Sequence, residues 1–193
     1  MENYINRKEY ISKLLSYKDK DLIKVVSGLR RSGKSTLLEI YCEHLLKNGV
    51  SKRQVQFYNF ELPENYLDKT WSDIYFDIKK KMQPNETNYV ILDEVQNIPS
   101  FEKLVDGLFA TENTDIYVTG SNAFLLSSEL ATLLSGRYIE ISILPFSFKE
   151  YLIARNIDTG NKYLNYETLF FDYVNETSLP KGVEYNTPQK LDS

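Results

Sequence analysis

The sequence predicts an α/β fold, a three-layer α/β/α sandwich in which helices cover both faces of a five-stranded parallel sheet. Two observations support this prediction. Short apolar runs typical of buried strands alternate along the chain with segments whose apolar residues recur at helical spacing. Of the 193 residues, 42% are hydrophobic, which is enough for one sizeable core and argues against a disordered chain.

The expected elements follow one another without internal repeats or low-complexity segments. Apolar runs predict the strands, at residues 22–26, 54–60, 89–92, 116–119 and 138–144. Helical spacing of apolar residues predicts the helices, at residues 7–15, 34–47, 70–82, 101–109, 123–134 and 147–154. Because a helix follows each strand, we expect the strands to run parallel.

The composition of the chain changes after residue 155. From Asn156 onward the sequence is polar and rich in Tyr, Asn and Thr, and it contains one helical pattern, formed by Tyr163, Tyr166, Phe170 and Val174. A segment of this length is too short to form a domain of its own. We therefore expect one core domain at residues 1–155 and, at residues 156–193, the beginning of a second module that has been truncated.

A phosphate-binding loop is predicted between the first strand and the helix at residues 34–47. Residues 28–35 read G-L-R-R-S-G-K-S, which matches the pattern G-x-x-x-x-G-K-[ST]. The two glycines let the backbone curl so that several N–H groups point inward, and the start of the helix adds unpaired donors and a partial positive charge. The strand–loop–helix context disfavours the alternative, an accidental glycine-rich turn.

We expect the polyphosphate of a nucleotide to bind along this loop. The residues expected to contact it are Gly28, Leu29, Arg30, Arg31, Ser32, Gly33, Lys34, Ser35 and Thr36. Lys34 would lie on the β- and γ-phosphates and act in catalysis, and Ser35 would supply a hydroxyl ligand to a bridging Mg²⁺. Arg30 and Arg31 either contact the nucleotide or a partner subunit, or they are solvated loop cations.

Two adjacent carboxylates end the third predicted strand, which reads Y-V-I-L before Asp93 and Glu94. Asp93 is suited to hold Mg²⁺, and Glu94 is suited to act as a base or to orient the attacking water. The alternative is a pair of solvated acids that cap the turn at residues 95–99. The adjacent glutamate, and the third place of this strand in the chain, favour an ATP hydrolase of the additional-strand class over small-molecule kinases and GTPases.

Composition and charge disfavour several other classes of protein. Cys42 is the only cysteine and His44 the only histidine, so an internal disulfide is excluded, a transition-metal site is disfavoured, and Cys42 is expected to be a buried thiol. The net charge of −4 argues against a surface that binds nucleic acid over its whole extent. No apolar run approaches the roughly 18 residues of a membrane span and no signal-peptide pattern is present, so we expect a soluble cytoplasmic protein.

Five motifs resemble those of the prokaryotic AAA+ ATPases whose phosphate loop reads GxRRxGKSTLL. They lie at residues 28–38, 91–97, 119–122, 134–138 and 144–151, and the resemblance extends from about residue 7 to residue 154. It implies an ATPase that uses ATP and Mg²⁺. Members of this family usually continue into a lid and a C-terminal domain of uncharacterised function, which implies that residues 156–193 are part of a lid or linker.

The resemblance also implies roles for four residues outside the two main motifs. Ser121 and Asn122 would form the polar sensor of the γ-phosphate, or they would cap the helix expected from residue 123. Asn59 would hold the catalytic glutamate in check, or it would be an ordinary amide at a strand end. Arg137 would reach the nucleotide site of a neighbouring subunit as an arginine finger, which implies a homo-oligomer, or it would complement the dipole at a helix C-terminus.

Two functions remain open at this point. The first is Mg²⁺-dependent binding and hydrolysis of ATP, coupled to an unknown partner or domain. The second is a nucleotide-gated binding module that holds ATP or ADP as a switch, turns it over negligibly, and regulates contacts with DNA or protein. Phosphoryl transfer to a small molecule is a more distant third.

Overall fold

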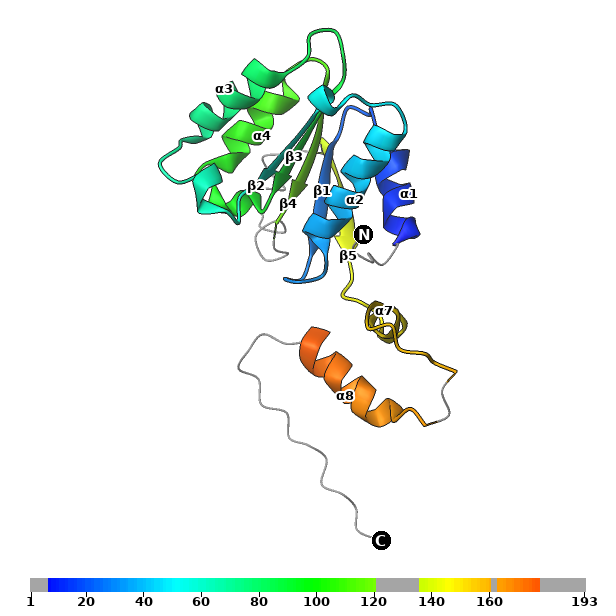
Figure 1. Ribbon diagram of the computed structural model, residues 1–193. Helices are drawn as coiled ribbons and strands as arrows, with labels where there is room; N and C mark the ends of the chain where they lie inside the picture. Colours follow the sequence, from blue (N-terminus) through cyan, green and yellow to red (C-terminus); the bar gives the residue numbers. More distant parts are fainter. Residues whose placement is uncertain (1–6, 121–135, 161–162, 178–193) are drawn as a thin grey trace. The chain divides into compact units, whose positions relative to one another are not determined.

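The structure, a computed structural model, describes residues 7–120, 136–160 and 163–177 (Figure 1). Its strands form one parallel sheet, which confirms the predicted α/β fold. The strands are β1 (Ile23–Gly28), β2 (Val55–Asn59), β3 (Asn88–Asp93), β4 (Thr114–Thr119) and β5 (Tyr138–Ile143). Their order across the sheet is β2-β3-β4-β1-β5.

Strand β4 lies between β1 and β3. Val118 of β4 pairs with Val25 of β1 on one side and with Leu92 of β3 on the other. One additional strand therefore separates the strand that ends in the two carboxylates from the strand that leads into the phosphate loop, in agreement with the class expected from the sequence.

Helices cover both faces of the sheet, which confirms the predicted three layers (Figure 1). Helices α1 (Lys8–Ser16) and α2 (Lys34–Lys47) lie on one face, and α3 (Trp71–Lys81) and α4 (Phe101–Phe109) lie on the other. Three short 3₁₀ helices lie in the connections, at Lys52–Gln54, Pro63–Asn65 and Val95–Asn97. The helix expected at residues 123–134 lies outside the described residues.

Side-chain alternation along the strands produces two apolar cores, one on each face of the sheet. In β3, Val90 and Leu92 belong to the core under α3 and α4, whereas Tyr89 and Ile91 belong to the core under α1 and α2. A strand buried on both faces reads as a continuous apolar run, which is why β3 could be predicted from so short a segment.

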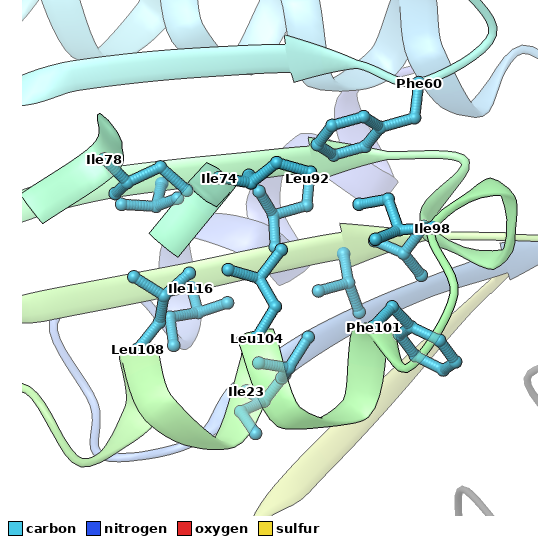
Figure 2. Packing of buried hydrophobic residues seen from close by; sticks show 14 of the residues in the cluster. Ile23, Phe60, Ile74, Ile78, Leu92, Ile98, Phe101, Leu104, Leu108 and Ile116 are labelled. Atoms are coloured by element: carbon cyan, nitrogen blue, oxygen red, sulfur yellow. The ribbon is translucent and has the colours of Figure 1, made fainter. Parts of the chain in front are cut away.

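The core under α3 and α4 is shown in Figure 2. Ile74 and Ile78 of α3 and Leu104 of α4 meet Leu92 and Ile116 of the sheet, and all five side chains are buried. Side chains of this size each contribute roughly 1.5–3 kcal/mol to the free energy of unfolding when they are fully buried. This packing holds the carboxyl ends of β3 and β4 in a fixed register, and the candidate site depends on that register.

The chain divides into two compact units, and the second begins at Pro145. Its helices α7 (Phe148–Ala154) and α8 (Tyr166–Thr177) pack through aromatic rings, with the Phe148 centroid 5.3 Å from that of Phe170 and 5.4 Å from that of Tyr173. The sequence analysis assigned the helix at 147–154 to the core domain and began the second module at residue 156. These ring contacts join α7 to α8 within the second compact unit, and the domain boundary expected at residue 155 stays a prediction.

Candidate nucleotide-binding site

The loop after β1 is shaped by two glycines. A Cβ atom on Gly28 would lie 2.7 Å from both the Ile143 carbonyl oxygen and the Ser32 Oγ, so any side chain there would clash with its neighbours. Gly33 adopts φ 87°, in the left-handed region, immediately before α2 begins. The first intrahelical hydrogen bond of α2 runs from the Leu37 N–H to the Gly33 carbonyl oxygen (2.9 Å). The N–H groups of residues 34–36 precede that bond, so they can donate hydrogen bonds to a ligand.

Lys34 lies within the loop and is nearly buried, with 4% of its side chain exposed. Its ammonium group is 3.5 Å from the Gly28 carbonyl oxygen, 3.3 Å from the Leu29 carbonyl oxygen and 3.4 Å from Glu94 Oε1. All three distances are at the long end for polar contacts, so each contact is weak. The ammonium group can therefore exchange these partners for phosphate oxygens at little cost.

Asp93 ends β3 and is completely buried. Its Oδ1 accepts a hydrogen bond from the Thr119 hydroxyl (2.5 Å), whereas its Oδ2 has no hydrogen-bond partner among the described residues. Burial raises the pKa of Asp93, and the nearby Thr119 and Ser35 hydroxyls act against that shift. A carboxylate with one oxygen fixed and the other open, close to a serine hydroxyl, fits a Mg²⁺ ion that takes its remaining ligands from phosphates and water.

Glu94 follows Asp93 in a left-handed backbone conformation, with φ 56° and ψ 51°. Its N–H donates to the Thr119 Oγ1 (2.9 Å), so one hydroxyl fixes both members of the carboxylate pair. Its side chain makes no cap hydrogen bond to the 3₁₀ helix at Val95–Asn97. The contacts of the Glu94 carboxylate are instead with Lys34 and, through Oε2, with the Gln96 Nε2 (2.5 Å).

A cleft of about 300 Å³ opens over these side chains. It is lined by Arg30, Lys34, Glu61, Glu94, Gln96 and Asn97. Arg30, Lys34 and Glu94 were predicted from the sequence. Glu61, Gln96 and Asn97 were not predicted from the sequence, although the two amides follow Glu94 by two and three residues and could have been noticed there. Arg31 is exposed at φ 66° and does not line the cleft.

Asn59 forms hydrogen bonds within the turn after β2. Its Oδ1 accepts a hydrogen bond from the Glu61 N–H (2.8 Å), and its carbonyl oxygen accepts one from the Asn65 side chain (2.6 Å). These contacts favour the interpretation of Asn59 as a strand-end amide. The amide that contacts Glu94 in this structure belongs to Gln96.

Arg7 supports the phosphate loop from outside it, which the sequence analysis did not anticipate. Its guanidinium donates to the Ser32 carbonyl oxygen (3.2 Å) and to the Leu144 carbonyl oxygen (2.8 Å). The Tyr10 hydroxyl accepts a hydrogen bond from the Leu144 N–H (3.2 Å). The residue that precedes α1 therefore ties the loop to the segment that follows β5.

Arg137 directly precedes β5, so it lies at the amino end of that strand. The phosphate loop, by contrast, follows the carboxyl end of the neighbouring parallel strand β1. Its carbonyl oxygen accepts a hydrogen bond from the Ile23 N–H (2.9 Å). Its guanidinium lies 3.5 Å from the Asp106 carboxylate and 5.4 Å from the centre of the Phe109 ring, and 46% of the side chain is exposed. Ser121 and Asn122 lie outside the described residues.

Comparison with known proteins places this fold and motif set in a family. A family model described as an AAA domain matches residues 20–152. The chain belongs to this AAA domain family. The matched range includes the phosphate loop, Asp93, Glu94 and Arg137. Membership in this family supports nucleotide binding.

Relatives of known sequence come from bacteria and archaea. An uncharacterized protein of Haemophilus influenzae is 42% identical over 187 residues, which cover 96% of this chain and 46% of that protein. An uncharacterized protein of Methanocaldococcus jannaschii is 32% identical over 156 residues, which cover 80% of this chain and 34% of that protein. The chain thus spans less than half the length of these relatives.

Solved structures resemble the fold at low sequence identity. Hsp104 of Saccharomyces cerevisiae, in its complex with casein, matches with a TM-score of 0.57 and 12% identity over 79% of this chain and 29% of that chain. PCH-2 of Caenorhabditis elegans matches with a TM-score of 0.51 and 15% identity over 88% of this chain and 54% of that chain. At these identities the likeness supports the fold alone.

Within the described ranges, no helix combines the length and apolar character needed to cross a bilayer.

Proposed function

We propose that the chain binds ATP together with Mg²⁺ at the carboxyl edge of its sheet and hydrolyses the bond between the β- and γ-phosphates. One observation supports this proposal above the others. Lys34, Asp93 and Glu94 converge at the ends of β1 and β3, and the Asp93 Oδ2 is buried there without a hydrogen-bond partner among the described residues. A buried open carboxylate oxygen is unfavourable unless a cation or donor completes it.

The loop amides and Lys34 would bind the phosphates of ATP. The amides of residues 34–36 precede the first intrahelical bond of α2 and would donate to phosphate oxygens. Lys34 would exchange its weak contacts with two loop carbonyls and Glu94 for the β- and γ-phosphates. The Ser35 hydroxyl and the Asp93 Oδ2 would hold Mg²⁺, which neutralises charge on the phosphate oxygens when it is bound.

Glu94 would accept the proton of the attacking water. Movement of Lys34 onto the phosphates leaves the Glu94 Oε1 without its cationic partner, so this oxygen becomes available as a base. The Thr119 hydroxyl keeps the Glu94 backbone beside Asp93 throughout. ATP binding would thereby produce the base that the hydrolysis requires.

The nucleotide-gated switch remains the second candidate because of one specific observation. Both carboxylate oxygens of Glu94 are engaged in this structure, one by Lys34 and one by Gln96. A domain whose catalytic base is held in this way hydrolyses ATP slowly unless nucleotide binding releases the base. In this second function the domain would hold ATP or ADP and regulate contacts with protein or DNA.

Replacing Lys34 tests nucleotide binding. Lys34→Ala removes the ammonium group from the loop, so calorimetry with Mg²⁺ and ATP should detect a loss of affinity of at least about 10²-fold. Lys47→Ala is the matched control, because Lys47 lies on the same helix, is 75% exposed and forms an ion pair with Glu43 one turn away. Equal affinity in the wild type and in Lys34→Ala would refute the proposed site.

Replacing Glu94 separates hydrolysis from the switch. Glu94→Gln keeps the shape of the side chain but removes the base, so ATP should still bind while phosphate release falls by roughly 10²-fold or more. A variant that hydrolyses ATP at the wild-type rate would show that Glu94 is not the base. A wild-type protein that binds ATP tightly and releases no phosphate would favour the switch.

The partners of this activity are part of the proposal. We propose that ATP hydrolysis acts on an unknown protein partner or on a further domain, with residues 156–193 serving as part of a lid or linker. We also propose that Arg137 reaches a neighbouring subunit of a homo-oligomer, which its exposed position at the start of β5 permits. A cytoplasmic location and contacts with nucleic acid stay predictions.

A further inference from the structure

Gln96 occupies an unusual position in the cleft. It lies in the short 3₁₀ helix Val95–Asn97, two residues after Glu94, and it lines the cleft beside Lys34. Its Nε2 donates to the Glu94 Oε2 (2.5 Å). Its Oε1 is buried and has no hydrogen-bond partner among the described residues.

The orientation of this amide follows from charge. The nitrogen faces the Glu94 carboxylate, because the reverse orientation would bring the amide oxygen against a carboxylate oxygen. The oxygen is thereby left as a buried acceptor at the wall of the cleft. Buried acceptors are rarely left unpaired, so this one indicates that a donor binds there.

The neighbouring amide shows what a purely structural role looks like in this segment. The Asn97 Nδ2 donates to the Phe60 carbonyl oxygen (2.9 Å) and ties the 3₁₀ helix to the end of β2. Gln96 makes no comparable bond to the backbone of another element among the described residues. Its side-chain hydrogen bond in the described part of the chain goes to Glu94, so its role is linked to that carboxylate and not to the connection between the elements.

We propose that Gln96 is a further catalytic residue that orients the attacking water together with Glu94. This inference rests on the proposed hydrolysis of ATP. Glu94 and Gln96 both line the cleft, and they carry two acceptors side by side, namely a carboxylate oxygen and the buried Oε1 that has no partner among the described residues. A water that donates one proton to each of them has its lone pair directed away from both.

The proposed hydrolysis needs no reactant beyond ATP, water and the two side chains already named. The water oxygen forms a bond to the γ-phosphorus, the bond from that phosphorus to the bridging oxygen breaks, and the electron pair leaves on the β-phosphate oxygen. Glu94 takes the proton that the water loses. Gln96 accepts a hydrogen bond throughout and is not itself protonated. The products are ADP and inorganic phosphate.

Gln96→Leu tests the proposal, because leucine keeps much of the bulk and removes the amide. Phosphate release should show kcat lowered by roughly 10²-fold, with KM and the affinity for ADP within about twofold of the wild type. The affinity for ADP with aluminium fluoride, which mimics the transferring phosphoryl group with the water in line, should fall. The affinity for ADP with beryllium fluoride, which mimics the ground state, should not.

The controls separate a catalytic role from a structural one. Gln83→Leu is the matched control, because Gln83 lies outside the cleft and donates to the Lys81 carbonyl oxygen. Should Gln96→Leu lose ADP binding, Gln96→Met provides a second variant, whose side chain is unbranched like that of glutamine. Loss of ADP binding in both variants would identify Gln96 as a structural residue and overturn the proposal.

The remaining outcomes distinguish this inference from the proposed function. If the wild type hydrolyses ATP and Gln96→Leu does so at the same rate, the role of Gln96 is refuted and the ATPase activity stands. If the wild type binds ATP but releases no phosphate, the hydrolysis and the role of Gln96 in it are refuted together.

Discussion

Thr119→Val removes the hydroxyl that holds the carboxylate pair together. Thr119 is completely buried, donates to the Asp93 Oδ1 (2.5 Å) and accepts from the Glu94 N–H (2.9 Å). Valine has nearly the same shape, so the substitution creates no cavity and its effect isolates the two hydrogen bonds. Both partners then lose the hydrogen bond that Thr119 supplies, and the Asp93 carboxylate loses it in a fully buried position.

The expected magnitude follows from these two bonds. A hydrogen bond to a carboxylate contributes about 1.5–3 kcal/mol, and one between neutral groups about 0.5–1.5 kcal/mol. Since the neighbouring groups relax in part, we expect a loss of about 2–4 kcal/mol in the free energy of unfolding. For a chain of this size, that loss corresponds to a fall in Tm of roughly 5–15 °C.

The same substitution should weaken Mg²⁺ binding. Without the Thr119 hydroxyl, the Asp93 carboxylate is free to turn away from the position in which its Oδ2 faces the site. Groups that orient a metal ligand typically affect metal affinity by about 10–100-fold. The affinity for ATP in the presence of Mg²⁺ should therefore fall, whereas the affinity for ATP in EDTA should change less.

Thermal denaturation followed by circular dichroism and calorimetry with Mg²⁺ and ATP provide the measurements. Thr119→Ser is the control, because it keeps the hydroxyl and removes only a methyl group, at a cost of about 1 kcal/mol. Equal stability and equal affinity of Thr119→Val and Thr119→Ser would refute the reasoning, since the hydroxyl would then contribute nothing to the site.

Two further predictions concern Arg137 and Cys42. If Arg137 acts as a finger, specific ATPase activity should rise with protein concentration, and a mixture of Arg137→Ala and Glu94→Gln subunits should recover part of the hydrolysis that each variant lacks. Activity independent of concentration, with no recovery in the mixture, would restrict Arg137 to its contacts with Asp106 and Phe109. Cys42 is only partly buried, against the core under α1 and α2, and not the fully buried thiol expected from the sequence. This partial burial raises the pKa of Cys42 to about 12 from its usual 9.0, so the folded protein at pH 8 should react with a thiol reagent about 10³-fold more slowly than the unfolded chain. Equal rates in the two states, measured with and without denaturant, would contradict the raised pKa of this thiol.

Elements with strong local signals could be predicted closely from the sequence. The helix predicted at 101–109 is α4 (Phe101–Phe109), and the helix predicted at 34–47 is α2 (Lys34–Lys47). These helices have clear apolar spacing, and the second follows a glycine-rich loop of defined pattern. The third strand was recognised from its apolar run, because both of its faces are buried.

Contacts between distant parts of the chain could not be predicted from local sequence patterns. Lys24 and Asp115 form an ion pair with 0% and 2% of their side chains exposed, yet 91 residues separate them in the chain. A lysine within an apolar run gives no sign of the carboxylate that will meet it. Its partner depends on the pairing of β1 with β4, which no local pattern encodes.

The sequence by itself determined the fold class, the phosphate loop and the acidic pair, because each depends on residue types at fixed short spacings. Only the tertiary structure decided what surrounds the Glu94 carboxylate. It placed Thr119 of β4 beside Asp93 across 26 residues, and it brought Lys34 at the start of α2 to the Glu94 carboxylate. The physical reason is that a side chain acquires its partners from the packing of separate elements, and that packing depends on the order and register of the whole sheet.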